Sequence, residues 1–201
     1  MMVARSLIVL FYISGCIFSL HAVEANISIY KFKGPALPYI EISTNYIGKS
    51  LKMKSLDSIG KQSMVQVTTL FLQNDQIIKA DKYLLNGPLV AQATDFMDIK
   101  RYSLAPGKYK LMTHIVDMND TSNVMNSAID FSLNFERGKT LFSDIQLLSE
   151  VRKSTEDNAM DKHGFYMEPI AENYYSKQLS ALFGYLEIYD LNEMQLNKIS
   201  V

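Results

Sequence analysis

The chain has 201 residues, of which 20 are Lys or Arg and 21 are Asp or Glu, so its formal net charge at pH 7 is −1. This near-neutral balance, without a block of basic residues, excludes the electrostatic footprint of a nucleic-acid-binding protein. Cys16 is the single cysteine, so no internal disulfide framework is possible. That favours a bacterial envelope protein over a small secreted domain held by disulfides.

The first 25 residues have the pattern of an export signal. Arg5 precedes the apolar run Ser6–Leu20, and small residues follow at Ala22 and Ala25. This order fits a positive n-region, an apolar h-region and cleavage after Ala25 or after Ala22. We therefore expect a cleaved signal peptide over these 25 residues and an exported protein, in the periplasm, the cell envelope or the extracellular space. An N-terminal membrane anchor is the alternative, but a spanning helix needs about 20 apolar residues, and this run is shorter and interrupted by Ser14.

Cys16 ends the tetrapeptide Ile13-Ser14-Gly15-Cys16, which resembles the lipobox of bacterial lipoproteins. In those proteins the cysteine is acylated and tethers the chain to the membrane. Residues 17–20 continue the apolar run, whereas a mature lipoprotein usually begins with polar residues. The alternative is that Cys16 serves as a small apolar residue of the signal. Membrane contact is expected only through the signal peptide or through this lipidation.

Strand signals dominate the rest of the chain. Residues of alternating polarity between turn residues predict strands, and we expect them at Asn26–Phe32, Tyr39–Ile47, Leu51–Leu56, Met64–Leu72, Gln76–Leu85, Ile99–Leu104, Tyr109–Asp117 and Ala128–Phe135. Asn74-Asp75 is the expected turn of a hairpin. Thr140–Leu148 fits either a last strand or a helical turn.

This pattern predicts an all-β, antiparallel sandwich of the immunoglobulin or fibronectin type over residues 26–148. Residues 149–164 are charged and lack a strand pattern, so we expect a linker there. Residues 165–201 are then an incomplete second β module or a C-terminal extension.

The segment Leu104-Ala105-Pro106-Gly107-Lys108-Tyr109 supports the sandwich. Pro106-Gly107 gives a tight turn, and the Tyr109 hydroxyl two residues later can fold back onto the turn backbone. This resembles the tyrosine corner of such sandwiches, with Leu104, Pro106, Gly107 and Tyr109 as structural residues. The alternative is an amphipathic aromatic residue at the start of a strand.

Few residues suggest chemistry. We expect His114 to be a sheet-face residue and His163 to be a turn residue, and neither has the spacing of a zinc ligand. Residues 117–123 begin like a calcium loop, but Ser122 replaces the expected Gly and Ala128 the expected Glu, so a hairpin turn is favoured. No catalytic, metal-binding or cofactor-binding residue is assigned.

A four-residue motif occurs twice in the chain: Tyr39-Ile40-Glu41-Ile42 recurs as Tyr185-Leu186-Glu187-Ile188. Each copy is interpreted as the opening strand of a β module, so Tyr39, Glu41, Ile42, Tyr185, Glu187 and Ile188 are structural residues. Glu41 and Glu187 occupy equivalent positions and are expected to face outward, because a catalytic pair of carboxylates needs two different environments.

The order of several short motifs resembles the N-terminal region of GWxTD-domain proteins of Bacteroidetes-type bacteria. These motifs are Pro38–Ile42, Asp81–Tyr83, Leu104–Tyr109 with Asp117, Phe142–Leu147 and Tyr185–Tyr189. The resemblance covers most of the chain and implies exported β-sandwich modules without catalytic residues to carry over. The chain contains no tryptophan, so the signature that defines the family is absent, and the chain is either a fragment or a shortened relative.

The function expected is therefore a non-enzymatic envelope module with a binding, spacer or assembly role. The first alternative is a carbohydrate-binding or carbohydrate-active protein that uses an exposed row of tyrosines, drawn from Tyr166, Tyr174, Tyr175, Tyr185 and Tyr189. The second is assembly with another envelope protein, through an unpaired strand edge at Leu182–Tyr189.

Overall fold

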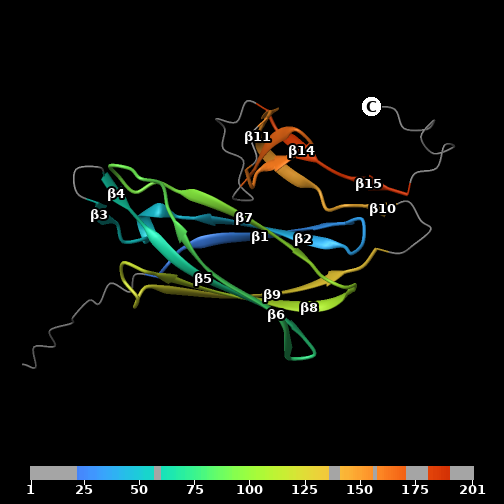
Figure 1. The fold of residues 1–201 in the computed structure, drawn as a ribbon, viewed down its shortest axis with the longest axis horizontal. Helices are drawn as coiled ribbons and strands as arrows, with labels where there is room; N and C mark the ends of the chain where they lie inside the picture. Colours follow the sequence, from blue (N-terminus) through green and yellow to red (C-terminus); the bar gives the residue numbers. More distant parts are fainter. Residues whose placement is uncertain (1–21, 57–59, 136–140, 156–157, 171–180, 191–201) are drawn as a thin grey trace, which may run out of the picture.

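The computed structural model describes residues 22–56, 60–135, 141–155, 158–170 and 181–190. Its core is an antiparallel β-sandwich, as predicted. One sheet has the order β1-β2-β7 and the other the order β6-β5-β8-β9 (Figure 1). The strands are β1 (Ala25–Phe32), β2 (Tyr39–Tyr46), β5 (Met64–Gln73), β6 (Gln76–Asn86), β7 (Phe96–Ser103), β8 (Gly107–Asp117) and β9 (Val124–Leu133). Three strands packed on four in this order is a fibronectin-like arrangement.

The hairpins follow from local sequence. Asn74 and Asp75 form the two-residue turn between β5 and β6, with φ of 51° and 61°. Positive φ at both central positions is the requirement of the type I′ turn, which Asn and Asp tolerate. Leu51–Leu56 is only partly a strand, because β3 begins at Lys54; Leu51 instead inserts into the core. The short hairpin of β3 (Lys54–Leu56) and β4 (Gly60–Gln62) and the 3-10 turn η1 (Gly48–Ser50) lie at one end of the sandwich.

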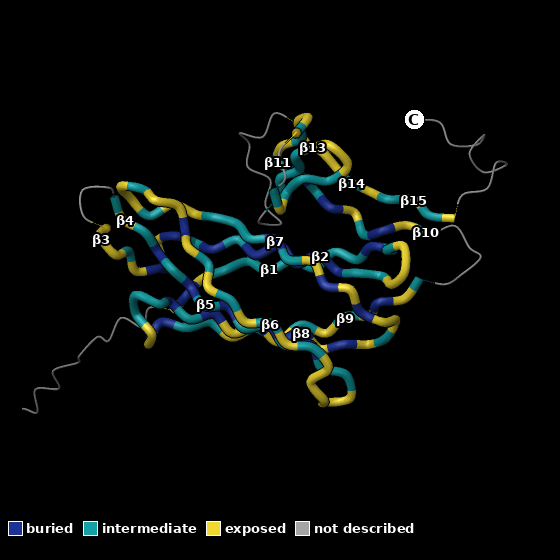
Figure 2. Tube along the Cα trace, viewed as in Figure 1, coloured by how far each residue is buried: buried dark blue, intermediate teal, exposed yellow. Residues whose placement is uncertain are grey.

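Two apolar clusters are buried in the sandwich, and Figure 2 shows the buried residues along its strands in dark blue. Alternate residues of each strand point inward, so β2 contributes Ile40 and Ile42, and β8 contributes Tyr109 and Leu111 to the first cluster. The second cluster gathers Val23, Tyr46, Leu51, Val65, Val67 and Ile115.

Val23 in this second cluster shows that the fold begins before Asn26, within the residues expected to form the signal peptide. Its side chain is 3% exposed, the carbonyl of Glu24 accepts a hydrogen bond from the Ile47 amide at 3.0 Å, and Ala25 already pairs with Tyr46 in the sheet. Residues 23–25 therefore belong to the fold. Of the two cleavage positions expected from the sequence, the one after Ala22 keeps these contacts, whereas the one after Ala25 removes them.

The predicted linker is wrong in part, because strands occupy residues near both of its ends. β11 (Gln146–Lys153) crosses the expected boundary at Ser149, and β12 (Asp161–Lys162) lies near the linker's end. With β13 (Phe165–Pro169) and β14 (Phe183–Tyr185) they form a sheet of order β12-β13-β11-β14. One face of this sheet is exposed to solvent and carries charged side chains such as Glu150 and Arg152. The strand pattern is therefore hidden in the sequence by charged residues.

The strands after the sandwich pair with one another and not with it. β10 (Leu141–Phe142) pairs with β15 (Ile188–Tyr189), and β11 pairs with β13 and β14. Thr140–Leu148 was expected to end the sandwich, but its described part, residues 141–148, opens this second unit instead. The C-terminal sheet lies over the outer face of β1-β2-β7, on the side away from β6-β5-β8-β9 (Figure 1).

Two expectations for the end of the chain are therefore corrected. The second copy of the repeat is not one opening strand, because β14 ends at Tyr185 and β15 begins at Ile188. The segment Leu182–Tyr189 is not an unpaired edge either, since Phe183–Tyr185 and Ile188–Tyr189 both have partners within this chain. Among the described residues, none lies in a helix with the length and apolar character needed to span a bilayer.

Candidate functional site

A buried charged cluster joins the C-terminal sheet to the sandwich. Glu41 does point to the outer face of its own sheet, as the alternation of β2 predicts, but it is 0% exposed. The expectation that it faces solvent is wrong, because the C-terminal sheet covers this part of β2. A buried carboxylate requires charged or hydrogen-bonding partners, and the two units supply them jointly.

Three side chains surround this carboxylate. Arg101, directly opposite on β7, places Nε 2.7 Å from Glu41 Oε2. Lys162 on β12 places Nζ 3.0 Å from the same oxygen. Gln146 on β11 donates from Nε2 to Glu41 Oε1 at 2.8 Å, and its own Oε1 accepts from Lys162 Nζ at 3.0 Å. The guanidinium of Arg101 also donates to the carbonyl of Ala159 at 2.8 Å.

Lys162 is the most enclosed cation of this cluster. Its side chain is 8% exposed, and Nζ lies 4.2 Å from the ring centre of Phe32 and 4.9 Å from that of Tyr185. Burial lowers the pKa of the Lys162 amine, although the charge of Glu41 acts in the opposite direction. Removal from water disfavours the ammonium form, so this environment favours a neutral amine more than a surface position does.

The second copy of the repeat lies at the same interface. Glu187 accepts hydrogen bonds at 2.5 Å from the hydroxyls of Tyr185 and Tyr189, one on each carboxylate oxygen. Burial raises the pKa of Tyr39 to about 12, and the negative charges of Glu187 and Glu41 add to the rise. The two copies of the repeat therefore meet in space, but in two different roles: Glu41 balances cations, whereas Glu187 binds phenols.

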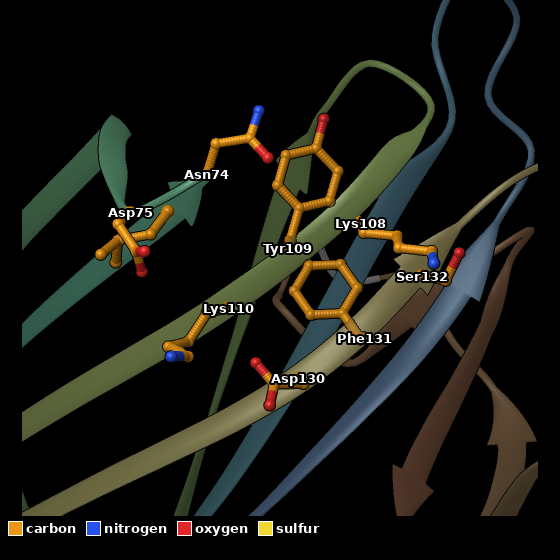
Figure 3. Close-up of a pocket in the computed structure, with 9 residues that line it drawn as sticks. Asn74, Asp75, Lys108, Tyr109, Lys110, Asp130, Phe131 and Ser132 are labelled. Atoms are coloured by element: carbon orange, nitrogen blue, oxygen red, sulfur yellow. The ribbon is translucent and has the colours of Figure 1, made fainter.

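A hollow of about 470 Å³ lies beside the β5–β6 turn (Figure 3). A register shift between Phe71 and Leu72 leaves Ile78 on β6 without an opposite residue on β5, close to this turn. The residues that line the hollow are Leu72, Asn74, Asp75, Lys108, Tyr109, Lys110, Asp130, Phe131 and Ser132. The rings of Tyr109 and Phe131 stack at 5.4 Å.

The charged side chains of the hollow include two of opposite sign on neighbouring strands. Lys110 on β8 is paired in register with Asp130 on β9. Within the described ranges of the chain, however, Lys108, Lys110, Asp75 and Asp130 have no ion-pair partner within 4.0 Å. Charged groups of both signs beside an aromatic pair are therefore available to a ligand.

The other residues singled out in the sequence have structural positions. The Tyr109 hydroxyl donates to the Ala105 carbonyl at 2.5 Å, which is the contact expected of a tyrosine corner. His114 is exposed, and its Nδ1 lies 2.8 Å from Asn126 Oδ1. His163, with a φ of 51°, occupies the β12–β13 turn beside Gly164.

The segment that begins like a calcium loop is a turn. Asp117 is fully buried and accepts backbone hydrogen bonds from Lys52 and Asn119, at 2.7 and 2.9 Å. Its carboxylate thus organises the β8–β9 connection. In the part of the chain that the structure describes, no three His, Cys, Asp or Glu side chains are grouped to hold a metal ion.

The described tyrosines of the C-terminal third do not present a flat row to solvent. The hydroxyls of Tyr185 and Tyr189 are engaged by Glu187, and Tyr166 lies under the guanidinium of Arg152, 4.1 Å from its ring centre. Tyr174, Tyr175 and Cys16 lie outside the described residues.

Sequence reasoning missed Arg101, Gln146 and Lys162. Gln146 lies in an ambiguous segment and Lys162 in the presumed linker, and neither position has a local signal of burial. Comparison of the chain with protein-family models, curated proteins and solved structures gives no match. The function is therefore argued from these residues.

Proposed function

We propose that this chain is a non-enzymatic binding module of the bacterial cell envelope, exported by a signal that ends at Ala22. The hollow beside the β5–β6 turn is its binding site. The C-terminal sheet covers the outer face of β1-β2-β7 and acts as a spacer that leaves the other sheet free. The order of motifs that resembles exported modules of GWxTD-domain proteins supports the same cellular location.

The observation that carries this proposal is the set of free charges in the hollow. Ligand sites combine a concave, partly apolar surface with a small number of polar groups that fix orientation. Leu72 and Phe131 supply apolar surface, while Lys110 and Asp130 supply opposite charges that have no ion-pair partner among the described residues. The buried carboxylates elsewhere differ from these charges, because Glu41 pairs with Arg101 and Asp117 accepts a hydrogen bond from the Lys52 amide.

Site-specific photo-cross-linking in intact cells tests the binding role. A photoreactive phenylalanine analogue replaces Met112, which is 41% exposed two residues from Lys110, and in a matched control it replaces Leu89, which is 43% exposed between β6 and β7. We expect an adduct with an envelope component from position 112 only, and its loss in Lys110→Glu. Adducts of equal yield at both positions, or none at either, would contradict the proposal.

Export is tested separately with the full chain carrying its own N-terminus. Cell fractionation should recover the protein outside the cytoplasm, and a protein retained in the cytoplasm would contradict the proposed location. Labelling with a radioactive fatty acid, compared with Cys16→Ala, distinguishes acylation at Cys16 from cleavage after Ala22.

A further inference from the structure

The carboxamide of Gln146 lies between the amine of Lys162 and the carboxylate of Glu41. Lys162 Nζ is 3.0 Å from Gln146 Oε1, and Gln146 Nε2 is 2.8 Å from Glu41 Oε1. The remaining oxygen of Glu41 is 3.0 Å from Lys162 Nζ. The three groups thus form a closed ring of contacts in which one carboxylate touches both nitrogens.

We propose that Lys162 and Gln146 join in an intramolecular isopeptide bond, formed once by the chain itself with Glu41 as the proton carrier. Lys162 Nζ attacks Cδ of Gln146, a new carbon–nitrogen bond forms, and the bond from Cδ to Nε2 breaks. The ammonium of Lys162 and the carboxamide of Gln146 become a secondary amide and an ammonium ion. Atoms and charge balance, and no oxidant or co-substrate is consumed.

The position of the amine suits this attack. Nζ lies 3.0 Å from Oε1 of Gln146, and Cδ is bonded to that oxygen at about 1.2 Å, so Nζ must leave its hydrogen bond and move above the carbonyl plane to attack the carbon. Holding the amine and the carboxamide in contact replaces a bimolecular encounter by an intramolecular step, which lowers the entropic part of the barrier.

The surroundings favour the reactive form of the amine. Only a neutral amine is a nucleophile. The side chains of Gln146 and Lys162 are nearly excluded from water, and the rings of Phe32 and Tyr185 flank Nζ. Burial lowers the pKa of Lys162, so loss of its proton to a neighbouring base costs less than it does on the surface.

Glu41 is placed to move the protons. A general base must lie within about 3.2 Å of the group it deprotonates, and Oε2 meets this condition at Nζ. Oε1 meets the same condition at Nε2, the nitrogen that must gain a proton to leave as ammonia. Arg101 fixes the carboxylate in this orientation through its 2.7 Å contact with Oε2. Glu41 ends the reaction in its original protonation state.

Formation of the bond requires that the C-terminal sheet has docked on the sandwich. Gln146 and Lys162 both belong to the C-terminal sheet, on β11 and β12, whereas Glu41 belongs to β2 of the sandwich. The proton carrier therefore reaches the reacting groups only after the C-terminal sheet has packed on the sandwich. Once formed, the amide closes the segment between β11 and β12 covalently.

Mass spectrometry of the denatured full chain tests the proposal without reference to activity. We expect a mass lower than that of the sequence by about 17 Da, the mass of one ammonia. Trypsin should then release a branched peptide that joins residues 140–152 to residues 154–177, because an acylated Lys162 is not cleaved. A chain with the full sequence mass and a free peptide 154–162 would overturn the proposal.

Variants separate the roles of the three residues. Lys162→Arg and Gln146→Ala should both restore the full mass, and so should Glu41→Gln in protein whose circular dichroism matches the wild type. Lys31→Arg is the matched control, because Lys31 also faces a carboxylate, Asp144 at 3.4 Å, but in an exposed ion pair; it should keep the deficit. A deficit of about 18 Da with Lys162 joined to Glu41 would overturn the assignment to Gln146, and a retained bond in Glu41→Gln would overturn the role of Glu41.

Discussion

Glu41 on β2 and Lys162 on β12 form an ion pair across the boundary between the sandwich and the C-terminal sheet, with 3.0 Å between Oε2 and Nζ. Both side chains are nearly excluded from water. A buried ion pair of this kind gains little over an apolar contact of the same shape, but loss of one partner is costly because the other charge stays buried. We therefore expect the pair to favour one docked position of the C-terminal sheet over others.

Replacing Glu41 by Ala should destabilise the protein strongly. Without the carboxylate the amide proposed above cannot form, so Lys162 stays a buried cation, and Arg101 loses its partner at 2.7 Å; removing one partner of a buried pair costs about 3–5 kcal/mol. Equilibrium unfolding in urea measures the change.

Glu150→Ala provides the control for Glu41→Ala. Glu150 contacts Arg152 at 3.1 Å, but both side chains are about half exposed, so the change should be about 0.5 kcal/mol or less. Similar losses in the two variants would show that the Glu41 cluster does not hold the two units together.

Alkaline pH should destabilise the protein through the buried phenol of Tyr39. The folded-state pKa of Tyr39 is raised to about 12, against about 10 in an unfolded chain. The unfolded state therefore releases this proton first. Stability contributed by the neutral phenol is complete below about pH 10 and declines as pH rises through about 12.

Two pKa units correspond to about 2.7 kcal/mol, and partial solvent contact reduces the expected loss at Tyr39 to about 1–2 kcal/mol. Urea unfolding at about pH 9 and about pH 11.5 measures it, with Tyr39→Phe as the matched variant. The variant should lose less stability than the wild type over this interval. An equal loss in both proteins would assign the effect to other groups.

Features set by neighbouring residues were predictable, and features set by docking were not. The turn at Asn74-Asp75 and the Tyr109 hydroxyl contact depend on a few consecutive residues, so sequence patterns identify them. Glu41 follows the alternation of β2 correctly, but alternation assigns a face of a sheet and not its burial. Its burial depends on Gln146 and Lys162, which reach it from more than a hundred residues away in a segment whose charges resemble a linker.

Tyr109→Phe should weaken the sandwich modestly. The variant keeps the ring stacked on Phe131 and removes only the hydroxyl that donates to the Ala105 carbonyl. One such hydrogen bond contributes about 1 kcal/mol, which thermal or urea unfolding can detect. Tyr166→Phe is the comparison, since its hydroxyl binds Glu168 at 3.0 Å on the C-terminal sheet, away from the sandwich core; its effect should be smaller. If Tyr166→Phe were the more damaging of the two, the tyrosine corner would have no special part in stability.

The mature protein should begin at Val23. The Val23 side chain fills part of the second core cluster beside Tyr46 and Leu51, and the Glu24 amide donates to Ser50 Oγ at 2.9 Å. A chain that began after Ala25 would lose this burial and both main-chain contacts of Glu24, at a cost of about 2 kcal/mol or more. N-terminal sequencing of the exported protein identifies the cleavage position, and urea unfolding compares a chain that starts at Val23 with one that starts at Asn26. An exported protein that starts at Asn26, with the same stability as the longer chain, would show that residues 23–25 are dispensable to the fold.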